Sequence, residues 1–236
     1  MSLLKVSGLH AHYGKSHILH GVDMEIGDGA IISLLGRNGS GRSTLLKAIM
    51  GLVPPTAGSV RLDNKELAGL RPFDVCRNGI GYVPEERLVF PNLTVDENLA
   101  MGVQKAAAGG KAWSVEEMYD YFPRLKERRA VNAGYLSGGE QQMLTICRSL
   151  LGNPRLLLID EPTEGLAPKI VEVVMEFILD IAKRGVAVML VEQKLTIALK
   201  VAEEVLVMGH GELVFRGTPE ELVQAPDVRR NWLEVA

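Results

Sequence analysis

The stretch that decides the fold runs Gly36-Arg37-Asn38-Gly39-Ser40-Gly41-Arg42-Ser43-Thr44. It follows an apolar run, Ala30 to Leu35, and it precedes a helical pattern that continues to Met50. Glycines let the backbone wrap closely around phosphate oxygens, and the N-terminus of the next helix adds a positive dipole. Between a strand and a helix, residues 36–44 therefore predict a phosphate-binding loop for ATP, with Ser43 as a Mg²⁺ ligand. A plain glycine-rich turn is the alternative.

Position 42 departs from this motif, which calls for lysine where the chain has Arg42. Arginine keeps the charge but presents a broad planar fork in place of a compact ammonium. Nucleotide binding can rest on the backbone N–H groups and Mg²⁺. Hydrolysis is more sensitive to this substitution, because one misplaced stabilising donor lowers the rate by about 10²–10³-fold.

Two carboxylates follow a second apolar run, in Leu156-Leu157-Leu158-Ile159-Asp160-Glu161. Asp160, at the end of the predicted strand, can reach Mg²⁺, since hard cations prefer oxygen ligands. Glu161 can hydrogen-bond a water that attacks the γ-phosphate, which makes it the candidate catalytic base. An acid pair after a strand is also common in ordinary turns.

A third motif reads Leu136-Ser137-Gly138-Gly139-Glu140-Gln141-Gln142. Ser137 and Glu140 alone form a capping box at the start of a helix. Two glycines in the first turn are poor helix formers, so their presence favours a role in which bare N–H groups meet an anion.

The order of elements predicts an α/β fold, because strands alternating with helices form a mostly parallel sheet. Val22 to Leu35 is interpreted as a β-hairpin that turns at Gly27 to Gly29. Capping boxes at Thr94 and Ser114 open helices in a helix-rich middle section, and residues 106–110 form a small-residue linker between them. We expect a single domain, 1–236, with a core of 1–87 and 151–236 and a helical subdomain of 88–150.

Composition narrows the function classes. The net charge of −3 over 236 residues gives no electrostatic reason to expect nucleic acid as a partner. Two cysteines, Cys76 and Cys147, are too few for a disulfide framework and indicate free thiols. No apolar run reaches the roughly 20 residues of a membrane-spanning helix, and no signal peptide is recognisable. The expected location is therefore cytoplasmic, with any work at a membrane done through a partner.

The three motifs, in this order, resemble those of ATP-binding cassette (ABC) ATPases over essentially the whole chain. The resemblance implies a RecA-like P-loop NTPase core, an N-terminal antiparallel β subdomain and two subunits packed head to tail, as a homodimer or with a homologue. Ser137, Gly138, Gly139 and Glu140 would then contact ATP bound to the partner chain. Tyr13 lies where the family stacks adenine, with an ordinary strand-edge aromatic as the alternative.

The resemblance also implies roles for two further residues. Glu85, in Gly81-Tyr82-Val83-Pro84-Glu85, stands where the family has a glutamine and would ligate Mg²⁺. Gln193 stands at the switch position, usually a histidine; it would hydrogen-bond the γ-phosphate but cannot carry a proton. Both departures leave Glu161 as the main base.

Within the family, the chain resembles the ATPases of branched-chain amino-acid importers. It rests on five segments of the sequence: Pro84-Glu85, residues 90–99, residues 137–143, Gly165-Leu166-Ala167-Pro168 and residues 191–193. It implies ATP-driven uptake of branched-chain or other hydrophobic or polar amino acids across the inner membrane, with the chain on the cytoplasmic face. Transmembrane permease subunits would dock near residues 85–98, and a periplasmic or extracellular solute-binding protein would be an indirect partner. Urea/amide-type importer ATPases, a nucleotide-gated subunit with little hydrolysis and a cassette protein acting on DNA or the ribosome stay open as alternatives.

Overall fold

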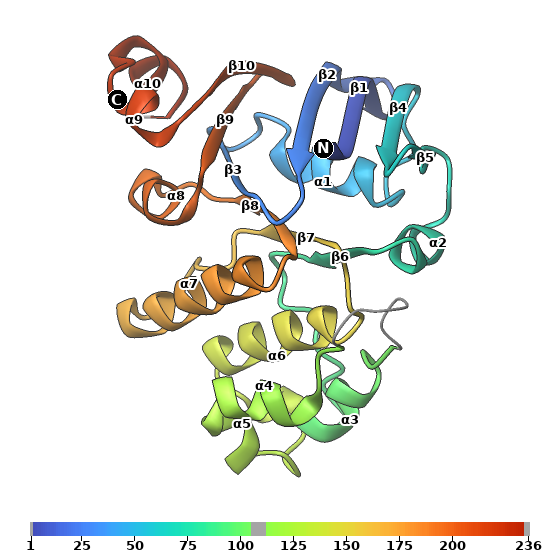
Figure 1. The fold of residues 1–236 in the computed structure, drawn as a ribbon, viewed down its shortest axis with the longest axis vertical. Helices are drawn as coiled ribbons and strands as arrows, with labels where there is room; N and C mark the ends of the chain where they lie inside the picture. Colours follow the sequence, from blue (N-terminus) through green and yellow to red (C-terminus); the bar gives the residue numbers. More distant parts are fainter. Residues whose placement is uncertain (1, 105–111, 234–236) are drawn as a thin grey trace.

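The computed structural model describes residues 2–104 and 112–233 (Figure 1). The linker predicted at 106–110 lies outside these residues. The strands are β1 Ser2–Tyr13, β2 Ser16–Gly27, β3 Ile31–Leu35, β4 Ala57–Leu62, β5 Lys65–Glu66, β6 Ile80–Val83, β7 Leu156–Asp160, β8 Ala187–Val191, β9 Glu204–Gly209 and β10 Glu212–Gly217. The helices are α1 Arg42–Ile49, α2 Pro72–Arg77, α3 Val95–Ala100, α4 Val115–Tyr121, α5 Pro123–Glu127, a 3₁₀ turn Ala133–Tyr135, α6 Gly138–Leu150, α7 Pro168–Lys183, α8 Leu195–Val201, α9 Pro219–Val223 and α10 Pro226–Trp232.

A six-stranded sheet forms the centre of the molecule, with strand order β10-β9-β3-β8-β7-β6. Its pairs are parallel except β10 with β9, which form a hairpin that turns at His210 and Gly211. Every residue of β3, β7 and β8 is buried, as expected for strands covered on both faces. This confirms the predicted α/β fold with a mostly parallel sheet.

Alternate residues of the central strands face two different cores. Leu156 and Leu158 of β7 pack with α1 and the antiparallel sheet. Leu157 and Ile159 pack with α6, α7 and the helical layer. The sheet is therefore the middle layer, and its carboxyl ends are fixed from both sides.

A second sheet, antiparallel, covers one face of α1, with strand order β2-β1-β4-β5. The predicted hairpin from Val22 to Leu35 is wrong, because β2 belongs to this sheet and β3 to the central one. The turn at Gly27–Gly29 carries the chain from one sheet to the other. Val22, Met24 and Ile26 are buried and alternate with more exposed residues, whereas β3 is buried throughout.

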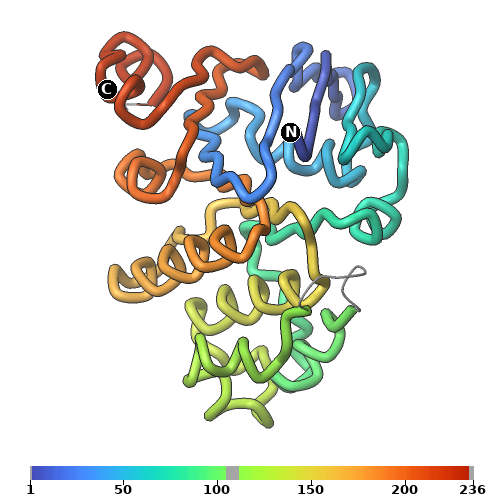
Figure 2. Tube along the Cα trace, in the orientation of Figure 1, coloured from blue at the N-terminus to red at the C-terminus, as the bar shows by residue number. Residues whose placement is uncertain are grey.

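The helical layer lies between β6 and β7 in the sequence, and its green and yellow trace forms one end of the molecule in Figure 2. The predicted capping boxes are present at Thr94, Ser114 and Ser137, where each side chain accepts from the backbone N–H three residues on. In the part of the chain that the structure describes, no helix is both long and apolar enough to cross a membrane.

Candidate active site

The loop of residues 36–44 joins the end of β3 to the start of α1 at the carboxyl edge of the central sheet. Gly36 must be a glycine, because a Cβ there would lie 2.5 Å from the Met208 carbonyl oxygen. Gly41 precedes the helix with φ 107°, a left-handed conformation that suits glycine. The loop borders a cavity of about 400 Å³ lined by Asn38, Gly39, Ser40, Gly41, Arg42, Ser43, Thr44, Glu85, Glu161, Glu164 and Gln193. Seven loop residues thus share one cavity with three carboxylates.

Arg42 is buried and bound on three sides. Its Nη2 forms an ion pair with Glu161 Oε1 at 2.9 Å, and the two side chains are only 5% and 7% exposed. Its Nη1 donates to the Glu192 carbonyl oxygen at 2.9 Å, and Nη2 also donates to Asn38 Oδ1 at 3.3 Å. The guanidinium therefore lies across the cavity against the predicted base.

Glu161 is held by a second residue as well. Gln193 Nε2 donates to both of its carboxylate oxygens, at 2.9 and 2.7 Å. Glu161 also has φ 45°, a backbone conformation that few non-glycine residues adopt and that clusters at functional sites. The structure thus brings Glu161, Gln193 and Arg42 into direct contact.

Ser43 Oγ donates to Asp160 Oδ1 at 3.2 Å. Burial, together with the charges of Glu161 and Glu85, raises the pKa of Asp160 to about 6, against the opposing hydrogen bond from Ser43. A buried carboxylate beside a hydroxyl and other acids is short of positive charge, so this oxygen set fits a Mg²⁺ ion.

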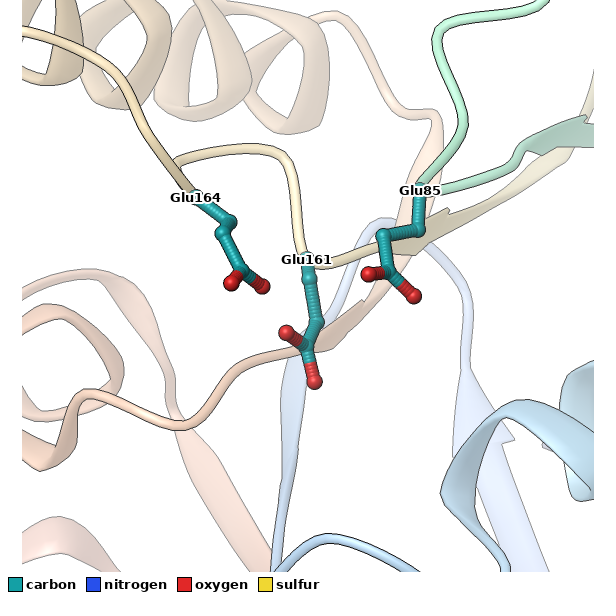
Figure 3. A group of neighbouring side chains, drawn as sticks. All are labelled: Glu85, Glu161 and Glu164. Carbon is teal, nitrogen blue, oxygen red and sulfur yellow. The ribbon is translucent and has the colours of Figure 1, made fainter.

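Three carboxylates converge at the mouth of the cavity (Figure 3). One oxygen each of Glu85, Glu161 and Glu164 lies within 4.8 Å of the others. A hydrogen bond with Glu161, then burial, raises the pKa of Glu164. Glu164 was not among the residues singled out from the sequence, although its position three residues after the predicted base was a usable signal.

Glu192 is a second residue near the site that the sequence did not single out. It is buried, burial raises its pKa, and it accepts a hydrogen bond from Thr163 Oγ1 at 2.8 Å. Its position just before Gln193 means that this bond ties the segment after Glu161 to the segment that carries Gln193.

Residues 137–140 lie elsewhere, at the start of α6 in the helical layer, and none of them lines the cavity. Ser137 N–H and Oγ both donate to Glu140 Oε2 at 2.8 Å, and Arg128 Nη1 pairs with the same oxygen at 3.1 Å. Arg87 lies over Gly138, where a Cβ would meet its Nη1.

Three predicted ATP contacts, Tyr13, Gly36 and Arg37, are not in the lining of this cavity. Tyr13, at the end of β1, is 49% exposed, and Arg37 lines a neighbouring cavity with His210 and Trp232. The adenine-stacking role of Tyr13 stays a prediction.

A mostly parallel sheet, a glycine-rich loop between β3 and α1, and an acid pair at the end of β7, two strands away from β3, define a P-loop nucleotide-binding protein. Residues 19–164 match the ABC transporter family, and the chain belongs to that family. It is accordingly an ATPase whose nucleotide hydrolysis is coupled to transport.

Two curated relatives cover nearly the whole chain. The chain is 42% identical to the high-affinity branched-chain amino acid transport ATP-binding protein BraG of Pseudomonas aeruginosa, over 98% of this chain and 99% of that protein. It is 36% identical to the probable branched-chain amino acid transport ATP-binding protein LivF of Archaeoglobus fulgidus, over 94% of each. Among solved structures it is similar to a dimeric post-hydrolysis state of an ATP-binding cassette bound to ADP and Pi, with a TM-score of 0.79, 26% identity and coverage of 92% and 98%.

Proposed function

We propose that the chain hydrolyses ATP as the energising subunit of an importer for branched-chain or other hydrophobic or polar amino acids. The observation that carries this proposal is the cavity in which the phosphate-binding loop faces Glu161 and Gln193. The amino-acid substrate rests on the similarity to BraG and LivF.

ATP would bind with its phosphates on the N–H groups of residues 36–44, and Mg²⁺ would be held by Ser43, Asp160 and Glu85. The ion supplies positive charge to the phosphate oxygens and keeps them in place. Glu161 accepts a proton from the attacking water, while the Gln193 amide orients that carboxylate and the γ-phosphate.

Arg42 has to exchange partners in this reaction. In the nucleotide-free chain its charge neutralises Glu161, and a γ-phosphate offers it a competing anion. Transfer of the guanidinium to phosphate would free Glu161 to bind water. Hydrolysis is therefore expected to depend on how readily this ion pair opens.

A second ATPase subunit completes the proposed site. Residues 137–140 do not reach the cavity of their own chain, so they are available to nucleotide bound to a homodimer partner or a homologous subunit. The similarity to a dimeric cassette bound to ADP and Pi supports this arrangement.

The permease subunits would dock in a groove between the core and the helical subdomain, proposed here as residues 88–150. A cavity of about 400 Å³ lies between them, and its lining includes Leu52, Leu88 and Met101, which are 49%, 57% and 64% exposed. Docking there would place the chain on the cytoplasmic face of the membrane, with a solute-binding protein acting on the other side.

Phosphate release from Mg-ATP by the purified chain tests the catalytic part of the proposal. Glu161→Gln is the inactive control, because the amide keeps the shape but cannot accept the proton. Turnover clearly above this control supports the proposal, and equal rates would overturn it.

Uptake of labelled leucine and labelled urea tests the substrate. Cells carrying the importer genes are compared with and without an intact copy of this chain. Loss of leucine uptake alone supports the proposal, whereas loss of urea uptake alone would assign the chain to a urea/amide-type importer.

A further inference from the structure

Four of the five histidines of the chain lie on one β-hairpin, outside the nucleotide site. His10 and His12 are on β1, and His17 and His20 are on β2; the structure pairs His10 with His20 and His12 with His17 across the strands. Ala11 and Leu19 between them are fully buried, so the imidazoles stand on the outer face of the antiparallel sheet.

His17 is the centre of this histidine cluster (His10, His12, His17 and His20). Its Nε2 lies 3.0 Å from His10 Nδ1. Its ring centroid lies 4.0 Å from that of His12, with the two rings stacked, and 4.0 Å from that of His20. Within residues 2–104 and 112–233, no carboxylate forms an ion pair with these four rings.

The backbone fixes the orientation of two of the rings. Gly21 has φ 87°, and a Cβ there would lie 3.2 Å from His10 Nε2, so glycine leaves room for the ring whose other nitrogen faces His17. His12 Nδ1 lies 3.0 Å from Thr56 Oγ1 on the segment before β4. When this nitrogen carries the proton, the His12 Nε2 lone pair is left free.

Two imidazole nitrogens 3.0 Å apart are close to the spacing of neighbouring ligands around one metal ion, since metal–nitrogen bonds are about 2.0–2.1 Å. Neutral imidazole is the form that binds metal.

We propose that the β1–β2 hairpin holds a transition-metal ion of the class that imidazole prefers, Zn²⁺, Ni²⁺ or Cu²⁺, on His10 Nδ1 and His17 Nε2. The rings of His12 and His20 flank this pair, each with its centroid 4.0 Å from that of His17. This site is distinct from the Mg²⁺ site proposed above, which offers oxygen ligands. The ion would cross-link β1 to β2 beside Tyr13.

The test is titration of the untagged chain with Ni²⁺ and Cu²⁺, followed by calorimetry and by electron paramagnetic resonance of the Cu²⁺ form. We expect one equivalent to bind with nitrogen couplings from at least two imidazoles. His17→Gln should weaken binding at least 10-fold, as should His10→Gln. His210→Gln is the matched control: the fifth histidine lies in the β9–β10 turn against Trp232, and its loss should leave affinity within about twofold.

Unchanged affinity in His17→Gln would overturn the proposal, as would a spectrum without nitrogen couplings. A loss in Glu164→Gln equal to that in His17→Gln would place the ion in the acidic group at the cavity mouth and would also overturn it. His17, Glu164 and His210 are exposed and His10 is half-buried within β1, and the spectrum of the unaltered chain tests the ligand type independently of these four substitutions.

Discussion

Arg42 is the residue that most distinguishes this chain, and its side chain explains what the substitution does. The planar fork of Arg42 donates to Glu161, to the Glu192 carbonyl oxygen and to Asn38, with two of its nitrogens sharing the three acceptors. Because Arg42 and Glu161 are both buried, their pairing is little screened by water. In the absence of nucleotide, the positive charge that this motif presents to phosphate is therefore paired with Glu161, the proposed base.

Arg42→Lys should raise the rate of Mg-ATP hydrolysis by about 10-fold or more, because the lysine releases Glu161 and presents its charge to the phosphates. Phosphate release under saturating ATP measures the effect, and Arg42→Lys combined with Glu161→Gln is the inactive control. A slower lysine variant would show that the arginine itself stabilises the transition state.

The raised pKa of Asp160 predicts that the free energy of unfolding depends on pH. Its folded pKa, about 6, is above its unfolded value, so between about pH 4 and 6 the native chain binds more protons than the unfolded chain. The stability contributed by Asp160 is therefore present below about pH 4 and is lost as the pH rises through 6. Asp160→Asn removes this loss, because its amide is never charged.

The difference in free energy of unfolding between Asp160→Asn and the unaltered chain should grow from near zero at pH 4 to about 2–3 kcal/mol in favour of the variant at pH 7. Urea denaturation in EDTA, without nucleotide, measures it at each pH. A difference that stays constant with pH would contradict the raised pKa.

At the scale of elements, the sequence correctly predicted those features that depend on contacts between residues close together in the chain. The capping boxes at Thr94, Ser114 and Ser137 were readable because each closes within three residues. The hairpin from Val22 to Leu35 was wrong because a turn signal does not say which sheet each flanking strand joins. Pairings such as Arg42 with Glu161, 119 residues apart, have no local signal at all.

A substitution at the start of α6 can test the contact with the partner subunit separately from the stability of the fold. Gly138 has room for a methyl group only if Arg87 moves, and a flexible side-chain end can do so. Alanine is the better helix former by about 1 kcal/mol, so Gly138→Ala should not lower the free energy of unfolding. The added methyl group would, however, stand in front of the N–H groups proposed to face the partner's ATP.

Gly138→Ala should therefore weaken ATP-dependent dimerisation at least 10-fold in a Glu161→Gln background, which accumulates ATP-bound chains. Light scattering with and without Mg-ATP measures it. Gly27→Ala, at the end of β2, is the matched control, because its Cβ would meet only Ala30 at 3.9 Å. Equal loss in both variants would argue against a contact role for α6.

At the scale of the whole molecule, the nucleotide cavity and the apolar groove lie at different places on the central sheet. Its carboxyl edge carries the phosphate-binding loop, Asp160 and Glu161, while the groove beside β6 exposes apolar side chains that the chain itself does not cover. Exposed apolar groups grouped at a groove are typical of a protein–protein contact. Pro84, directly after β6, lines the groove and Glu85 lines the nucleotide cavity, so one short segment borders both.

Leu88→Glu with Met101→Glu should consequently abolish uptake while the purified chain hydrolyses ATP at an unchanged rate. Two carboxylates in an apolar contact would stay unpaired and desolvated, at a cost of several kcal/mol, yet on the free chain both positions face water. Co-purification with the permease and labelled leucine uptake measure the first effect, and phosphate release the second. Val223→Glu, at an apolar position 47% exposed on α9, is the matched control and should leave uptake intact. Uptake that survives the double variant would move the permease contact to another face, and hydrolysis lost with uptake would mean that the groove and the nucleotide cavity cannot be separated.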